Sequence, residues 1–288
     1  MPAGRARRAA SAGLLLCSLA GCAGGAAGAE DGRLDVLVTS YPLQYVAEQV
    51  GGDDVVVTNL TPPGGDSHRL EPAPHEVAAL SGADVVVHQS GGMQPAVDDV
   101  VAQEEPEHLV DAAPLADRGA DPHFWLDPLR LAEFGRTVAG QLAAVDPDHG
   151  ADYRARADRL DVTLRSIDGE YAEALAACRG ATLLASHEAF GYLAERYGLR
   201  QMGVAGLDPY VEPPPSRLRK VADEVADSGA RTIFFEATAG SAVAEVLAAD
   251  LGLGTDVLHP VERVAAGETY PDLMADNLAA LRRGLTCG

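Results

Sequence analysis

The chain has 288 residues, of which 47% are hydrophobic and 23% are charged. This length suits one large or two modest globular domains, and the composition is too apolar for a disordered chain. With 22 Lys and Arg against 43 Asp and Glu, the formal net charge is −21. A surface of this charge repels phosphates, which argues against nucleic acid or anionic lipid as a partner and favours a small cation.

The first residues predict an export signal. Three arginines precede residues 9–20, an apolar stretch of about a dozen residues that is too short to span a bilayer. The stretch ends in Leu19-Ala20-Gly21-Cys22, which resembles the lipobox of bacterial lipoproteins. We therefore expect a lipoprotein signal peptide over residues 1–21 and acylation of Cys22, which would hold the protein on the outer face of the cytoplasmic membrane by lipid alone. The alternative is an ordinary signal peptide cut within residues 24–29.

The cysteine count is consistent with an oxidising compartment. Cys17 lies inside the signal peptide and Cys22 would carry the lipid, which leaves Cys178 and Cys287 as a pair. Neither has a Cys or His at the spacing of a zinc site. A disulfide between them and two free thiols both remain open from the sequence, because it does not show whether the two Cα atoms come close.

The next part of the chain predicts a short tether and an α/β lobe. Residues 22–32 are rich in Gly and Ala and read as flexible. From residue 33 to 127, apolar runs typical of buried parallel strands alternate with helical patterns. The expected strands are 34–39, 54–60, 83–88 and 108–110, and the expected helices are 43–50, 74–80 and 94–103.

The middle of the chain, residues 128–178, has no strand-like run. Asp146-Pro147-Asp148 predicts the end of one helix and the N-cap of another, which would run from about Pro147 to Ala177 and measure about 45 Å. Such a rod can connect two lobes. In residues 179–288 the α/β alternation resumes, with expected strands at 181–185, 201–205, 232–235 and 256–258 and helices at 189–197, 216–227, 241–251 and 270–285. The predicted fold is α/β, with two parallel-sheet lobes and a helical connector.

Three histidines stand where such lobes bind ligands, beyond the carboxyl ends of strands. His68 and His187 each follow a predicted strand, and His123 lies between two prolines just before the connecting helices. Three imidazoles suit zinc, which normally takes a fourth ligand to complete a tetrahedron. Glu262, after the last strand, and Glu236, at the end of the strand before it, are the candidates for that position.

Several motifs in order along the chain resemble the solute-binding proteins of zinc and manganese ABC importers. They include Asp121-Pro-His123-Phe-Trp-Leu-Asp-Pro128, Ser186-His187-Glu-Ala-Phe-Gly-Tyr192 and Tyr270-Pro-Asp-Leu-Met274. The resemblance implies two Rossmann-like lobes, a long rigid helix that joins them, and one metal ion in the cleft. In the zinc branch of that family it places ligands at His68, His123, His187 and Glu262. From its place at the end of a strand, we expect Glu236 to be a hydrogen-bonding partner of a ligand or a rival ligand.

The sequence therefore predicts a monomeric, non-enzymatic zinc-binding protein that passes its ion to an ABC permease. Three alternatives remain open at this stage: a manganese-binding protein of the same family, a metal-dependent surface adhesin, and a secreted zinc hydrolase. A hydrolase needs a coordination position for an activated water, whereas four protein ligands fill the tetrahedron. The His-Glu-x-x-His motif of zinc peptidases is also missing from the sequence.

Overall fold

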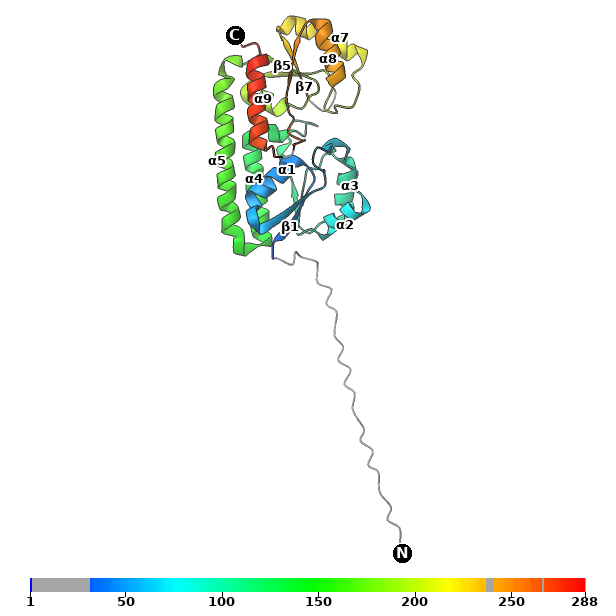
Figure 1. Ribbon diagram of the computed structural model, residues 1–288, viewed down its shortest axis with the longest axis vertical. Coiled ribbons are helices and arrows are strands. Elements are labelled where there is room, and N and C mark those ends of the chain that lie inside the picture. Colours follow the sequence, from blue (N-terminus) through cyan, green and yellow to red (C-terminus); the bar gives the residue numbers. More distant parts are fainter. Residues whose placement is uncertain (2–31, 237–240, 266, 288) are drawn as a thin grey trace.

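The computed structural model describes Met1 and residues 32–236, 241–265 and 267–287 (Figure 1). Within these residues the chain forms two four-stranded parallel sheets with helices against them, which confirms the predicted two-lobed α/β architecture. The predicted signal peptide, Cys22 and most of the tether lie outside the described residues. Among the residues that are described, no helix is long and apolar enough to cross a membrane.

The two sheets have the same strand order. It is β2-β1-β3-β4 in the first sheet and β6-β5-β7-β8 in the second, and all neighbouring strands pair in parallel. The strands are β1 Leu34–Val38, β2 Val55–Asn59, β3 Val85–His88, β4 Leu109–Asp111, β5 Thr182–Ala185, β6 Arg200–Gly203, β7 Thr232–Phe235 and β8 Gly254–Val257. In each sheet the carboxyl ends of all four strands therefore lie at one edge.

Helices cover both faces of each sheet. Figure 1 shows α5 along one flank of the molecule, with α4 beside its lower part and α9 beside its upper part. Helices α2 and α3 lie on the far side of the first lobe, and α7 and α8 lie on the far side of the second. The helices are α1 Tyr41–Gly51, α2 Pro74–Gly82, α3 Pro95–Glu104, α4 Pro128–Val145, α5 Gly150–Ala174, α6 Gly191–Tyr197, α7 Pro215–Ser228, α8 Ser241–Leu251 and α9 Tyr270–Gly284.

One hydrophobic core runs through both lobes. In β1, Val36 and Val38 point into this shared core, whereas Leu37, between them, points into a smaller core under α2 and α3. The second sheet repeats the arrangement, because Leu183 enters the shared core and its neighbour Leu184 enters a separate core under α7 and α8. The alternation follows from the two-residue period of a strand. The lobes are thus joined by common packing as well as by the chain.

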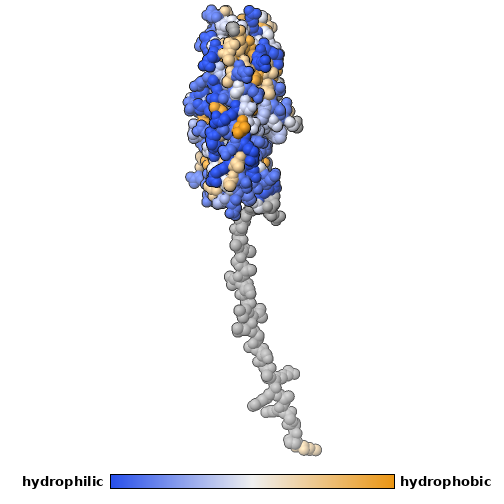
Figure 2. All heavy atoms as spheres, turned by 90° about the vertical axis from the view of Figure 1, so that its left-hand side faces the viewer, coloured by the Kyte–Doolittle hydropathy of each residue, from blue (hydrophilic) through white to orange (hydrophobic). Residues whose placement is uncertain are grey.

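The helix α5 contacts both lobes. Near its first turns, Arg156 donates hydrogen bonds to the Gly51 carbonyl (2.8 Å) and to Asp54 (2.6 Å) of the first lobe. Near its last turns, the Tyr171 hydroxyl donates to the Met274 carbonyl of α9 (2.6 Å). Its outer face is largely hydrophilic in Figure 2, whereas Tyr171 and other residues at helical spacing are buried. The predicted connecting rod is therefore present.

The bounds predicted for that rod were wrong at both ends. The helix was expected from about Pro147 to Ala177, but α5 covers Gly150–Ala174 and is preceded and followed by single 3-10 turns, Pro147–His149 and Ala176–Cys178. Asp146 is the C-cap of α4, and its carboxylate contacts His149 and Tyr153 instead of capping α5. At 25 residues, α5 is about 37 Å long.

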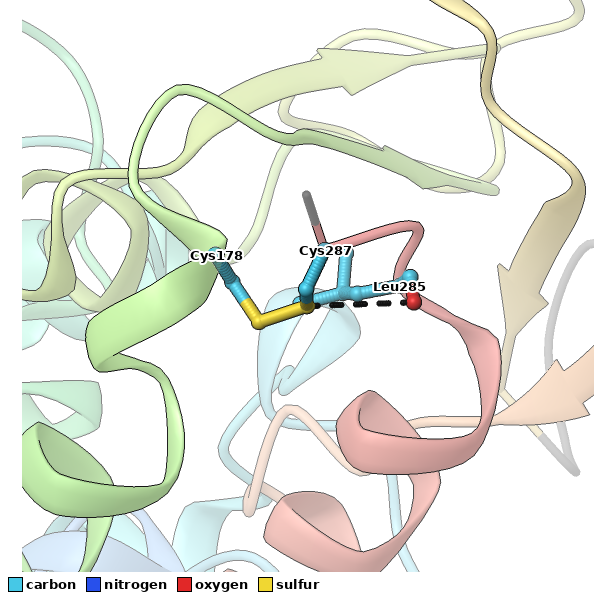
Figure 3. Close-up of a disulfide and its surroundings, with 3 residues drawn as sticks. All are labelled: Cys178, Leu285 and Cys287. Atoms are coloured by element: carbon cyan, nitrogen blue, oxygen red, sulfur yellow. Dashed lines mark hydrogen bonds between the residues drawn. A yellow bond between two sulfur atoms is a disulfide. The ribbon is translucent and has the colours of Figure 1, made fainter.

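A disulfide joins Cys178, in the turn after α5, to Cys287, beyond the end of α9 (Figure 3). The two Cα atoms are 4.3 Å apart, and 109 positions separate the cysteines in the sequence. The covalent loop therefore contains every strand of the second sheet.

Candidate metal centre

A cluster of possible metal ligands lies between the two lobes, in loops that follow strands. His68 sits in a 3-10 turn, Ser67–Arg69, after β2, and His123 lies in the segment between β4 and α4. Glu262 lies in the loop between β8 and α9 of the second lobe. One ligand atom from each of these three residues lies within 4.8 Å of the others. The fold therefore brings together three of the four predicted ligands.

The three side chains converge on one point. Glu262 Oε1 lies 3.2 Å from His68 Nε2 and 2.9 Å from His123 Nε2. The shorter contact lacks hydrogen-bond alignment, so that His123 Nε2 is buried without a hydrogen-bond partner. His123 is fully buried and Glu262 is 5% exposed. Two imidazole nitrogens and a carboxylate oxygen that approach each other in this way fit a shared cation.

A second carboxylate orients His123. Asp121 Oδ1 lies 2.8 Å from His123 Nδ1 and also accepts a hydrogen bond from the His123 backbone amide at 3.1 Å. A short turn of this kind is typical of Asp two residues before a backbone donor. With Nδ1 engaged by Asp121, the ring presents Nε2 to the cluster, as metal-binding histidines commonly do.

His187 lies beside this cluster without joining it. Its ring centroid is 5.7 Å from that of His123, and it is 1% exposed. Its Nδ1 lies 2.5 Å from Glu236 Oε1, but the contact is not aligned as a hydrogen bond, unlike the one between Asp121 and His123. His187 Nε2 has no hydrogen-bond partner although it is buried. An orphaned imidazole nitrogen at such a place is consistent with a ligand for an ion.

The loop that carries His68 is tied to both lobes. Gln94 Nε2 donates to the carbonyl oxygens of Thr39 (2.8 Å) and Ser67 (3.0 Å), which fixes the loop to the end of β1. From the second lobe, Arg263 contacts the carboxylate of Asp66 at 3.1 Å. His68 therefore stands on a segment whose backbone is held from two sides.

The other histidines lie apart from the cluster in the described part of the chain. His88 is buried, but its Nδ1 faces Asp98 at 3.8 Å, and His149 pairs with Asp146. The backbone of His259 is held by the side chain of Asn277.

A cavity of about 480 Å³ opens between the lobes beside the cluster, and its lining includes Tyr41, Glu48, Glu262 and Glu268.

The electrostatics of the cluster are those of a buried ion pair. Burial lowers the pKa of His123, but Asp121 and Glu262 outweigh it and raise that pKa to about 9. Burial likewise opposes the protonated form of His68, and Glu262 more than compensates, so that the pKa of His68 is raised. For Glu262, burial raises the pKa, but the two imidazoles lower it by more and hold it well below its usual range.

The fold and the cluster together define a class, the two-lobed solute-binding proteins that hold a small ligand between α/β lobes. The family model for the zinc-uptake complex component A, periplasmic, matches residues 36–284, and the chain belongs to this family. The resemblance seen in the sequence is thereby confirmed.

Individual relatives share about three residues in ten with the chain. The zinc-binding lipoprotein AdcA of Streptococcus pneumoniae is 31% identical, and the match covers 88% of this chain but 56% of AdcA. A crystal structure of the Zn(II)-bound ZnuA-like domain of that AdcA superposes with a TM-score of 0.77, at 32% identity over 88% of this chain and 99% of that domain. This chain thus spans little more than half the length of AdcA.

Two further relatives match over nearly their whole length. The high-affinity zinc uptake system protein ZnuA of Bacillus subtilis is 29% identical over 91% of this chain and 90% of its own. The laminin-binding protein Lmb of Streptococcus agalactiae, described as an adhesin with metal-transporting activity, gives a TM-score of 0.80 at 30% identity over 87% of this chain and 99% of its own.

Two residues at the site escaped the sequence analysis. Asp121 lies two positions before His123, a spacing from which its contact with the ring could have been inferred. The indole N–H of Trp125 donates to a backbone carbonyl 135 positions away. No local pattern signals a contact of that range.

The pKa shift at His123 predicts how the metal-free protein responds to pH. His123 holds its proton more tightly in the folded chain, with a pKa of about 9, than in the unfolded chain, where the pKa is 6.5. Its contribution to stability is therefore complete below about pH 6.5 and is lost as the pH rises through 9. We expect the free energy of unfolding, measured with urea and a chelator present, to fall over this range.

The matched variant is His123→Gln, which lacks the titrating group. The difference in free energy of unfolding between wild type and His123→Gln should shrink from about pH 6.5 to 9. A difference that stays constant or grows over this interval would contradict the assignment.

Proposed function

We propose that this protein is an extracytoplasmic zinc-binding component of an ABC importer and hands its ion to the permease. The observation that carries the proposal is the convergence of His68, His123 and Glu262 between the lobes, with ligand atoms within 4.8 Å of one another. Membership of the zinc-uptake family supports transport as the purpose of this site.

We further propose His187 as the fourth ligand. Its two ring nitrogens are buried without hydrogen-bond partners beside the cluster, and the carboxylate of Glu236 lies 2.5 Å from Nδ1. Three neutral imidazoles and one carboxylate would leave the bound zinc with a net charge of +1. The shell would then consist of protein atoms alone, which suits capture and transfer and leaves no position for an activated water.

The donor set favours zinc over manganese. Manganese prefers oxygen donors, whereas imidazole suits zinc, and the Irving–Williams order places zinc above manganese at a site of this kind. The acidic surface, with a formal net charge of −21, would raise the local concentration of either cation and add no selectivity. The adhesin alternative rests on similarity alone, because no surface feature of the described residues marks a site for a matrix protein.

A competition experiment tests the metal. Protein purified without added ions should bind one zinc per chain, and equimolar zinc should displace bound manganese, as measured by elemental analysis after desalting. His187→Glu replaces a nitrogen donor by an oxygen donor and should reduce the difference in affinity between zinc and manganese. A wild-type protein that keeps manganese in the presence of equimolar zinc would overturn the zinc assignment.

The roles proposed for Glu262 and Glu236 differ and can be separated. Loss of Glu262 removes a metal ligand, so zinc-loaded Glu262→Ala should show an additional solvent oxygen by X-ray absorption spectroscopy. Glu236→Ala should keep the ligand set of wild type but weaken binding by about 10- to 100-fold, because it frees the His187 ring. Glu268→Ala, a carboxylate change in the neighbouring cavity, serves as the control and should leave the spectrum unchanged. An altered shell in Glu236→Ala with an unchanged shell in Glu262→Ala would exchange the two roles.

We also propose that the protein is anchored by a lipid on Cys22. The support is the lipobox-like Leu19-Ala20-Gly21-Cys22, together with the AdcA relative, which is a lipoprotein by name. Cys22→Ala should release the protein from the membrane fraction into the medium, as seen by fractionation and immunoblotting. Cys17→Ala, five positions earlier, is the control and should stay with the membrane. Equal membrane retention of Cys22→Ala and wild type would refute the anchor.

A further inference from the structure

Trp125 lies between the two segments that carry His123 and Glu262. It is the only tryptophan in the sequence and is fully buried, in the 3-10 turn Phe124–Leu126. Its ring stands edge-on to that of His123, with 5.3 Å between centroids. A side chain so close to one ligand of the proposed site is well placed to influence another.

The indole reaches across to the second lobe. Its Nε1–H donates a hydrogen bond of 2.7 Å to the carbonyl oxygen of Pro260, two residues before Glu262. The backbone of Trp125 is fixed in turn, because the Tyr270 hydroxyl at the start of α9 donates to the Trp125 carbonyl at 2.7 Å. The hydrogen bonds thus join the His123 segment directly to the loop that presents Glu262.

The loop before Glu262 has an unusual backbone. Val261 has a φ of +62° and is fully buried, although a β-branched residue rarely adopts a left-handed conformation. Such a conformation persists only where the surroundings hold it. Here Asn277 clamps His259 with two 2.7 Å hydrogen bonds on one side, and Trp125 holds the Pro260 carbonyl on the other.

We infer that Trp125 is a positioning residue, whose indole N–H holds the Pro260–Glu262 turn so that the Glu262 carboxylate stays against His123 before an ion arrives. This inference rests on the proposed zinc-binding function. A ligand pair fixed in advance loses less freedom when the ion binds, which strengthens binding. Without the N–H, the buried Pro260 carbonyl loses its partner and the Val261 turn can relax, so Glu262 is less well held.

The effect should appear mainly in the rate of zinc release. We expect Trp125→Phe to raise the dissociation constant for zinc about 10-fold, mostly through a faster dissociation rate. This is the lower end of the effect of losing a hydrogen bond that orients a metal ligand. Zinc transfer to a chromophoric chelator measures that rate. In cobalt-substituted protein, the visible absorption bands should also shift, because they report the ligand geometry.

Trp125→Phe also leaves a smaller ring, so a second substitution is needed to separate the effect of the lost N–H hydrogen bond from the effect of the lost packing. Because the sequence has one tryptophan, cells fed L-β-(benzo[b]thiophen-3-yl)alanine change position 125 alone. This analogue has sulfur in place of the N–H and keeps the bicyclic shape. Tyr153→Phe is the control, because it deletes another buried aromatic donor, the 2.8 Å hydrogen bond to Asp146 between α4 and α5.

The outcomes are distinct. Faster zinc release and shifted cobalt bands in both Trp125 variants, with neither change in Tyr153→Phe, would support the inference. An analogue that matches wild type in both measurements, even where Trp125→Phe does not, would overturn it, because shape would then suffice. A wild-type protein that binds no zinc would instead refute the proposed function.

Discussion

The whole arrangement depends on one buried charge. Glu262 is 5% exposed and lies against two imidazoles, and a carboxylate removed from water is tolerated only with close positive or hydrogen-bonding partners. Those partners come from the other lobe, and His68 stands 194 positions before Glu262 in the sequence. The relative position of the two lobes must therefore be fixed by contacts outside the site. The shared core and the helix α5 provide those contacts, because α5 is held at both ends by buried or partly buried hydrogen bonds.

Two of the proposed imidazole ligands, His123 and His187, have a carboxylate beside the ring nitrogen that points away from the ion site. Asp121 is hydrogen-bonded to Nδ1 of His123, and Glu236 lies 2.5 Å from Nδ1 of His187 without hydrogen-bond alignment. The two pairs come from different lobes, so in each pair the imidazole and its neighbouring carboxylate belong to the same lobe. His123 follows β4 and His187 follows β5, which take different positions in the repeated strand order, but both lie beyond the carboxyl ends of strands.

Much of this could be predicted from the sequence, because the relevant signals are local. Valine-rich runs ending at Val38 and Val87 marked strands, and the rule that ligands follow strands singled out His68 and His187. The rest depends on contacts between distant segments. The distance from Glu262 to His123 and the bond from Trp125 to Pro260 are set by how the lobes dock, which no short pattern encodes. The ends of α5 were also misplaced, because Asp146 turns toward His149 and Tyr153 and does not cap the helix.

The disulfide between Cys178 and Cys287 has a consequence for resistance to proteolysis. Proteases attack exposed and mobile segments of a chain. Here the segment that follows α9 is bonded to the turn that follows α5, so the second sheet is enclosed in a covalent ring. A single cut in an exposed loop of that ring would leave the fragments attached to each other. The lobe that contributes Glu262 would then stay assembled after damage that would separate the pieces of an unlinked chain.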